Sequence, residues 1–222
     1  ILYIENMSHN CIKRYLLPAG ICVLVILGIV YYYFFSSMLS HSETQYVYID
    51  ADDNIDSVYT KLQPISNRHT MIGFRTLTRH SAYAKHIREG RYAIKPGQGA
   101  FTVFRHLKNG MQEPVSLTIS STRTLERLSA EVSKKLMMDS TALYHVLTSP
   151  KVCAQLGYDT ATISCIFIPN TYAVYWNISP EKFLERMDKE SKDFWNGERK
   201  EKAQALNLTP VQVITLASIV DE

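Results

Sequence analysis

Two adjacent carboxylates, Asp221 and Glu222, end an apolar stretch that begins at Thr209. A carboxylic acid in a partly apolar, closed site has a raised pKa and can serve as a general acid near neutral pH. The stretch has the signals of a helix start, because Thr209 is a good N-cap, Pro210 suits the first helical position and Gln212 completes a capping box. We therefore expect an amphipathic helix that buries one face and presents the carboxylates at its far end. The apolar positions of this face are Val211, Ile214, Ala217 and Val220.

The second half of the chain is predicted to be mainly helical, because its apolar residues recur at helical spacing. An apolar, strand-like run at 163–168 interrupts the helices and is followed by Pro169–Tyr172, which has the composition of a turn. Asn196 and Gly197 then separate a long helix from a charged one. The predicted helices cover 124–136, 140–147, 150–156, 179–195 and 209–222.

Residues 40–119 are predicted to form a small α+β module of short elements. Lys95–Gly99 is a turn by composition, and Gly110 follows a short helix as its C-terminal cap. Such a module could hold a sugar chain, but it offers no obvious catalytic constellation. The expected strands are 46–49, 88–94 and 113–119, and the expected helices are 54–62, 71–87 and 100–109.

The segment Tyr15–Ser42 carries no Asp, Glu, Lys or Arg. About 20 apolar residues are enough to cross the hydrocarbon core of a bilayer, so we predict a transmembrane helix at 15–39. A signal peptide would have a shorter apolar region and a small-residue cleavage site, which favours an uncleaved anchor. Basic residues precede the segment and acidic residues follow it. The positive-inside rule therefore places residues 1–14 in the cytoplasm and the chain after Ser40 outside.

The composition argues against two kinds of function. The 24 Lys and Arg residues nearly balance the 21 Asp and Glu residues and form no basic block, which excludes nucleic acid as an expected partner. The four cysteines form no C-x-x-C motif and have no paired histidine, so a zinc site is not expected. Cys153 and Cys165 leave two alternatives open, a disulfide, which an outer compartment permits, or a buried unpaired pair.

Three local patterns follow one another along the chain. The first pattern consists of Glu89–Gly97, followed by Phe104–Gly110 and Pro114–Val115. The second pattern is Phe167–Tyr172, and the third is Leu216–Val220. Together they resemble the endolytic murein transglycosylases, the MltG or YceG-like family. The first resembles the LysM-like subdomain of that family. The second resembles its motif of an aromatic residue, any residue, Pro, Asp or Asn, Thr and an aromatic residue, and the third resembles the start of its catalytic helix.

The resemblance implies an α+β protein anchored by one helix in the bacterial inner (cytoplasmic) membrane, with most of the chain on the periplasmic or outer side. It implies a lytic transglycosylase that cuts nascent peptidoglycan glycan strands between N-acetylmuramic acid and N-acetylglucosamine. One Glu protonates the glycosidic oxygen and then acts as base while the C6 hydroxyl closes a 1,6-anhydro ring, so no metal or cofactor is needed. The implied partners are glycan strands, the lipid bilayer and cell-wall synthesis or division proteins. The implied domains are a cytoplasmic N-terminus (1–14), a transmembrane helix (15–39), a LysM-like module (40–119) and the N-terminal part of the catalytic domain (120–222).

The family motif, carried over residue by residue, places Asp221 and Glu222 at two variable positions. The catalytic Glu then falls at the next position, which this chain lacks; in the alternative register, Glu222 itself is the acid. No glycine, proline or basic turn ends the last helix, and the chain begins with Ile1. We therefore expect a truncated polypeptide that is inactive as it stands.

Four further residues are candidates for contact with the glycan. Each also has a structural explanation, because a Pro-Asn-Thr sequence is good turn chemistry and a small helical residue often serves close packing. Many family members have Glu-Gly where this chain has Ser164 and Cys165, so a role for that acidic residue does not carry over. The four candidates are Asn170, Thr171, Tyr172 and Ser218.

A protein of another class fits the same module and anchor, namely a non-catalytic, membrane-tethered protein that binds peptidoglycan or division partners. A reading frame that continues past Glu222 with Glu-Thr and a further lobe would favour the enzyme, and a stop codon would favour the binding protein. A receptor-like sensor is disfavoured, because few residues precede Tyr15 to form a cytoplasmic output domain.

Overall fold

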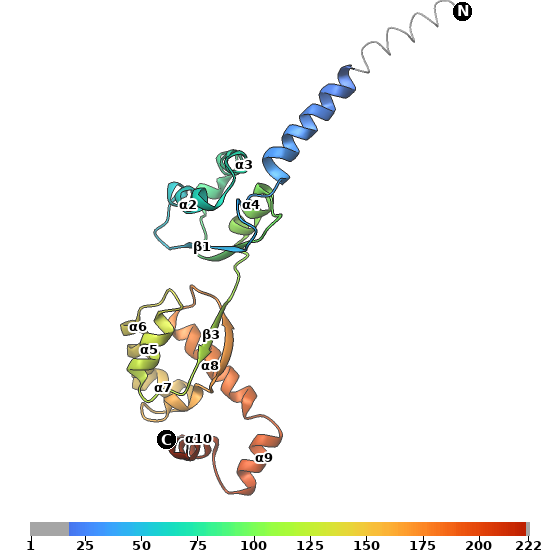
Figure 1. Cartoon of the computed structure of the whole chain (residues 1–222). Coiled ribbons are helices and arrows are strands. Elements are labelled where there is room, and N and C mark those ends of the chain that lie inside the picture. The colour runs from blue at the N-terminus through green and yellow to red at the C-terminus, as the bar shows by residue number, and fades with distance from the viewer. Residues whose placement is uncertain (1–17, 221–222) are drawn as a thin grey trace, which may run out of the picture. The chain divides into compact units, whose positions relative to one another are not determined.

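The computed structural model describes residues 18–220, which divide into two compact units between Glu113 and Pro114 (Figure 1). The predicted cytoplasmic segment 1–14 lies outside the described residues, and so do Asp221 and Glu222. Each unit has its own hydrophobic core.

The first unit begins with an apolar helix, Pro18–Phe35, whose 18 residues have a mean hydropathy of 2.1 (Figure 1). It is long and apolar enough to span a membrane, and its last turn, η1 (Tyr31–Phe35), is a π-helix. Among the described residues, a second stretch is long and apolar enough only if α9 (Glu198–Ala205) and α10 (Pro210–Val220) are counted as one span. The chain bends by 82° between these two helices. One helix therefore matches the predicted span.

The predicted span at 15–39 runs too far at its C-terminal end. Ser36 is extended, with φ −67° and ψ 157°, which ends the helix at Phe35. Met38 is fully buried in the core of the first unit, and its amide donates to the Gln98 carbonyl at 2.7 Å. Apolar residues after Phe35 thus belong to the module, and hydropathy alone does not distinguish them from the helix.

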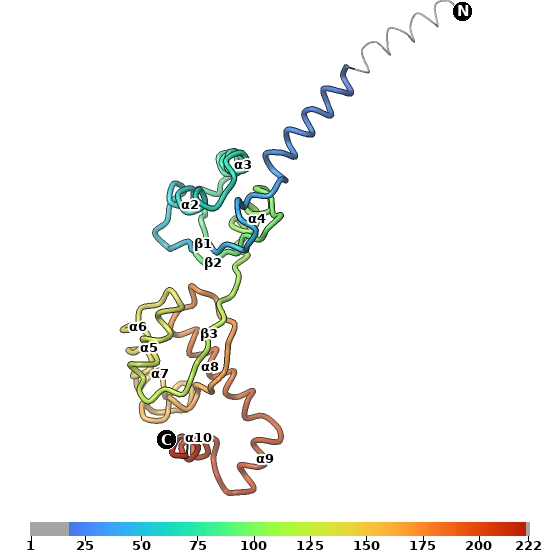
Figure 2. The backbone as a smooth tube through the Cα atoms, viewed as in Figure 1, coloured from blue at the N-terminus to red at the C-terminus, as the bar shows by residue number. Residues whose placement is uncertain are grey.

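The described part of the first unit after the apolar helix is a strand, two helices, a second strand and a third helix. Strand β1 (Gln45–Ile49) pairs antiparallel with β2 (Gly90–Ile94), and the two lie side by side in Figure 2. The predicted helix 71–87 is instead α3 (Arg68–Arg79) and a separate 3₁₀ turn. The other elements are α2 (Ile55–Leu62), η2 (Gln63–Ile65), η3 (Ala82–Lys85) and α4 (Ala100–Asn109). The core includes Met38, Val58, Leu62, Phe74, Tyr92 and Leu107.

The C-terminal end of the apolar helix packs against α3 and α4. The Tyr32 ring stacks on the His69 ring with centroids 4.1 Å apart, and Ser36 Oγ lies 2.9 Å from His69 Nε2. Two glycines permit this close approach. A Cβ on Gly73 would lie 2.1 Å from the Tyr33 carbonyl oxygen, and one on Gly99 would lie 2.6 Å from a carbonyl oxygen of the same turn. The end of the apolar helix therefore packs against the module through direct backbone contacts at Gly73 and Gly99.

An ion-pair cluster next to β1 makes the stability of the first unit depend on pH. Lys61 donates to Asp50 at 2.6 Å and also to Asp53, which accepts the Asp50 amide at 2.8 Å. Burial alone would raise the pKa of Asp53, but these hydrogen bonds outweigh it and hold the pKa below its ordinary value.

A lowered pKa in the folded state means that Asp53 stabilises the fold above its unfolded pKa, about 3.9. We expect this stabilisation to be lost as the pH falls from about 4 through the folded pKa of Asp53. Unfolding midpoints measured between pH 7 and acid should fall less steeply for Asp53→Asn than for the wild type. The exposed neighbour Asp52 provides the control, since Asp52→Asn should keep the wild-type slope. Equal slopes for Asp53→Asn and the wild type would contradict the assignment.

The second unit consists of a two-stranded ribbon and a set of helices. Strand β3 (Val115–Ile119) pairs antiparallel with β4 (Asn170–Val174). Helix α5 packs against β3 and α6, and α6 packs against α8. The helices are α5 (Leu125–Ser133), α6 (Ser140–Leu147), α7 (Pro150–Leu156), α8 (Pro180–Phe194), α9 and α10, with a 3₁₀ turn η4 (Ile163–Ile166). The core includes Leu117, Leu128, Leu143, Ile163, Tyr172 and Phe183.

Two sequence-based assignments are corrected by this pairing. The strand at 113–119 was predicted to close the first module, but Val115–Ile119 pairs with β4 of the second unit. The predicted strand at 163–168 contains the 3₁₀ turn η4, and the predicted turn at 169–172 holds the first residues of β4. Strand β4 forms its backbone hydrogen bonds with a strand about 50 residues earlier in the chain. The local composition around β4 carries no information about that partner.

Candidate functional site

Strand β4 carries three of the four candidate glycan-binding residues, Asn170, Thr171 and Tyr172, and its two faces differ. Tyr172 and Val174 point into the core, while Asn170, Thr171 and Ala173 are exposed. From Thr171 to Val174 the alternation follows from the period of a strand, in which successive side chains point to opposite faces. Asn170 shares the face of Tyr172 and pairs with the buried Ile119, and it is exposed at the first position of the strand. The motif Phe167–Tyr172 is therefore divided between the core and the surface.

Tyr172 is a core residue. Its side chain is 6% exposed, and its hydroxyl donates to the Ile168 carbonyl at 2.5 Å. Burial raises the pKa of Tyr172, and the Glu190 carboxylate adds to this effect. The position supports a structural role, in which the hydroxyl ties β4 to the segment before it.

The variant Tyr172→Phe separates this structural role from glycan binding. Removing the hydroxyl leaves the Ile168 carbonyl without its donor, which we expect to cost about 1–2 kcal/mol of unfolding free energy. Urea unfolding of Tyr172→Phe and of the exposed control Tyr175→Phe should show a lowered midpoint in the first only. Retention on glycan strands should be the same in both variants. Unchanged stability together with weaker retention would show that the hydroxyl contacts the glycan.

The exposed face of the β3–β4 ribbon is lined by small, uncharged polar groups. The hydroxyls of Thr118 and Thr171 lie 2.9 Å apart across the two strands on this face. Asn170 begins β4 on the other face, and its Oδ1 accepts the Thr171 amide at 2.8 Å. Ser116 is exposed on the same face of β3 as Thr118. Such a surface can exchange hydrogen bonds with sugar hydroxyls. Ser116 and Thr118 were not among the residues predicted from the sequence, although their alternation with buried Leu117 indicates an exposed face once β3 is assigned to this unit.

Helix α10 begins as the sequence predicts. The Thr209 amide donates to Gln212 Oε1 at 2.8 Å, and the Gln212 amide donates to Thr209 Oγ1 at 3.3 Å, which confirms the capping box. The helix packs against η4, where Thr215 hydrogen-bonds with the Cys165 thiol. It thus lies next to the turn that leads into β4.

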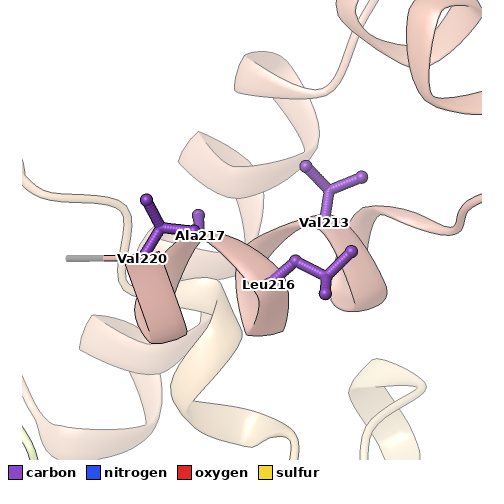
Figure 3. A pocket seen from close by; sticks show the side chains of 4 residues that line it. All are labelled: Val213, Leu216, Ala217 and Val220. Carbon is purple, nitrogen blue, oxygen red and sulfur yellow. The ribbon is translucent and has the colours of Figure 1, made fainter. Parts of the chain in front are cut away.

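The second half of the predicted buried face of α10 is open to solvent. Val211 and Ile214 are half-buried, but Ala217 is exposed and Val220 is 86% exposed. Apolar side chains of this helix line a shallow pocket of about 420 Å³ (Figure 3). The prediction of a buried face is therefore wrong for the second half of α10, because among the described residues η4 and α9 cover only its beginning. The pocket is formed by Val213, Leu216, Ala217 and Val220.

Ser218, the fourth candidate, is exposed and donates its hydroxyl to the Thr215 carbonyl of its own helix at 2.8 Å. The described part of α10 contains no Asp or Glu, since the predicted acid at Glu222 lies outside the described residues.

Cys153 and Cys165 are both buried free thiols, so the structure shows the unpaired alternative. Cys153 Sγ donates to the Leu147 carbonyl at 3.2 Å, and burial raises the pKa of this thiol. Burial also raises the pKa of Cys165, although its hydrogen bond with Thr215 lowers it in part. Within residues 18–220, no three His, Cys, Asp or Glu side chains are grouped so that they could hold a metal ion.

Comparison with known proteins gives the family. The model of the YceG-like family matches residues 47–222, which include parts of both units, and the chain therefore belongs to the YceG-like family. A solved structure at 2.6 Å, of a protein from Listeria monocytogenes described as yceG-like, is similar to this chain with 14% identity and a TM-score of 0.39. The similarity covers 77% of this chain and 61% of the Listeria chain, so this chain spans less than two thirds of that relative. No curated protein matches the chain.

Proposed function

We propose that this YceG-like protein is a membrane-anchored lytic transglycosylase that cleaves within nascent peptidoglycan glycan strands. The observation that carries the proposal is the family match over residues 47–222. The bond cleaved is that between N-acetylmuramic acid and N-acetylglucosamine, and the product ends in a 1,6-anhydro ring. The strand–helix–helix–strand arrangement of the first unit is consistent with the LysM-like module of the proposal.

A single carboxylate performs the proposed reaction in two steps. As general acid it protonates the glycosidic oxygen, and as base it then accepts the proton of the C6 hydroxyl while that oxygen attacks the anomeric carbon. Because no water molecule attacks, the reaction does not need the second carboxylate that activates water in inverting hydrolases. We assign this carboxylate to the end of the helix that α10 begins, either to Glu222 or to the position directly after it.

The exposed face of the β3–β4 ribbon is the proposed contact surface for the glycan. Thr171 and Thr118 offer hydroxyls there, and neither side chain is charged. Asn170, which is exposed at the start of β4, is proposed to offer its side-chain amide beside this surface. Ser218 is proposed to line the same site from α10. Tyr172 contributes by holding β4 in place.

The proposed location is the bacterial inner membrane, which the apolar helix Pro18–Phe35 crosses once. Basic residues before this helix and acidic residues after it support a periplasmic or outer location for the chain after Ser40. Glycan strands are the proposed ligand, and proteins of cell-wall synthesis or division are the proposed protein partners.

The test incubates the protein with uncrosslinked glycan strands and identifies 1,6-anhydro ends by mass spectrometry. Two forms are compared, the chain ending at Glu222 and the same chain extended through the codons that follow. Gln is introduced at Glu222 or at the first Glu after it, and Asp221→Asn serves as the matched control. Loss of the product only in the second Gln variant supports the register in which Glu222 is a variable position. Loss only in Glu222→Gln assigns the acid to Glu222.

One outcome of this experiment would favour the other class of protein. If neither form yields any product while both still retain glycan strands, the protein is a membrane-tethered binding protein rather than an enzyme. Failure of both retention and cleavage would contradict the proposal and its alternative.

A further inference from the structure

Helix α3 presents three different faces. Its core face carries buried residues such as Phe74 and Thr78. A second face carries His69 and Gly73, which contact the end of the apolar helix. At 100° per residue, the side chains of a third face fall between these two, and they are exposed. This outer face consists of Arg68, Ile72, Arg75 and Arg79.

A pocket of about 590 Å³ lies where η2 leads into the outer face of α3. Two of its lining residues are the arginines Arg68 and Arg75, and none is acidic. Within the described part of the chain neither guanidinium has a carboxylate in ion-pair contact, and that of Arg75 lies 5.0 Å from the centre of the Tyr59 ring. The pocket is lined by Gln63, Ser66, Arg68, Met71, Ile72 and Arg75.

Two further observations show that the pocket is suited to an anion. The first turn of α3 has no acidic residue and no side-chain cap, and the side-chain Nδ2 of Asn67 instead donates to the carbonyls of Ser37 and Leu39. A positive residue, Arg68, thus begins a helix whose N-terminus already carries a partial positive charge. Ser66 Oγ, which also belongs to the pocket, is buried without a hydrogen-bond partner among the described residues. A bound anion would accept hydrogen bonds from the N-terminus of α3, from the Arg68 guanidinium and from the Ser66 hydroxyl.

The apolar helix determines which anion can reach this pocket. Its 18 described residues correspond to about 27 Å of helix, close to the roughly 30 Å of a hydrocarbon core. If this helix spans the bilayer, Tyr31–Phe35 lies at the interface, where tyrosines are enriched. His69, the direct neighbour of Arg68, contacts that end of the helix through Tyr32 and Ser36. The pocket therefore lies at the level of the lipid headgroups.

We propose that this pocket binds the phosphate of an anionic phospholipid headgroup in the outer leaflet. Arg68 and Arg75 pair with the phosphate, Ser66 donates its hydroxyl, and the half-exposed Ile72 enters the headgroup layer. The lipid contact holds the first unit against the membrane surface. This inference rests on the membrane anchoring proposed above, but not on the transglycosylase activity.

The test places a polarity-sensitive fluorophore on Ile72→Cys of the full chain in lipid nanodiscs that contain a headgroup-level quencher lipid. Cys11 and Cys22 are replaced by alanine, and the buried Cys153 and Cys165 are kept. In discs containing phosphatidylglycerol we expect quenching at least twofold stronger than in discs of phosphatidylcholine alone.

The double variant Arg68→Gln/Arg75→Gln should lose this difference between the two kinds of disc. The control Lys134→Gln/Lys135→Gln removes the same charge from exposed sites of the second unit and should keep it. Equal quenching in both discs, or an unchanged difference in the arginine variant, would overturn the inference. So would inorganic phosphate abolishing the difference, because the ligand would then be a free anion.

A separate readout distinguishes this inference from the anchoring on which it depends. Flotation of the same chain with phosphatidylcholine vesicles reports insertion of the apolar helix alone. A chain that floats but shows no lipid-dependent quenching overturns the headgroup site and leaves anchoring intact. A chain that does not float overturns both.

Discussion

Replacing Gly73 with alanine is expected to detach the apolar helix Pro18–Phe35 from α3. The added Cβ would lie 2.1 Å from the Tyr33 carbonyl oxygen and 2.9 Å from its carbonyl carbon, which is far inside van der Waals contact. Both groups are backbone, so no side-chain rotation can relieve the overlap. We expect a cost of about 3 kcal/mol in docking free energy, and with it the loss of the stacking between Tyr32 and His69.

Pulsed electron paramagnetic resonance measures this detachment directly. Spin labels on cysteines introduced at Leu24 and Thr60, with Cys11 and Cys22 replaced by alanine, should give a narrow distance distribution in the parent chain and a broad one in Gly73→Ala. Gly28→Ala is the matched control, because Gly28 lies in the same apolar helix and nothing lies within 4 Å of its added Cβ. A narrow distribution in Gly73→Ala, equal to that of Gly28→Ala, would show that the helix is not seated on α3.

Truncation of Phe183 to alanine is the substitution expected to destabilise the second unit most. Phe183 is fully buried in α8, and its ring stacks on Phe167 with centroids 6.2 Å apart. Phe167 opens the motif that leads into β4, so the cavity would also loosen the candidate site. Buried Phe→Ala changes cost about 3–5 kcal/mol, which is a large part of the roughly 5–15 kcal/mol that stabilises a typical domain.

Urea unfolding followed by near-ultraviolet circular dichroism should show a greatly lowered midpoint for Phe183→Ala. Tyr175→Ala removes an aromatic side chain that is 56% exposed in the same unit, and it should shift the midpoint by no more than about 0.5 kcal/mol in free energy. If the two variants were equally stable, Phe183 would not be the packing centre that the structure shows.

Elements set by neighbouring residues could be predicted from the sequence. Gly110 ends α4 with φ 68° and Gly157 ends α7 with φ 85°, because a left-handed residue at a helix end favours glycine. Ser179 caps α8 by accepting the Lys182 amide, and Thr209 and Gln212 cap α10 as expected. These interactions involve residues at most a few positions apart, so the sequence pattern contains both partners.

Features set by distant partners could not be predicted. The assignment of β3 to the second unit depends on β4, and the boundary of the apolar helix depends on Met38 entering the core of the first unit. For the candidate site, the motif located Asn170 and Thr171, but only the strand pairing shows that Tyr172 points inward. The pocket at Arg68 and Arg75 likewise required the packing of η2 and α3.

The most direct test of the proposed chemistry is to run the reaction on uncrosslinked glycan strands in water enriched in the heavy oxygen isotope. In a lytic transglycosylase, the sugar's own C6 oxygen forms the new bond to the anomeric carbon. No oxygen from the solvent therefore enters the product. We predict 1,6-anhydro ends without the heavy isotope, formed by the extended chain and absent when its catalytic Glu is replaced by Gln. New reducing ends that carry the heavy isotope would show that water is the nucleophile, and would contradict the account.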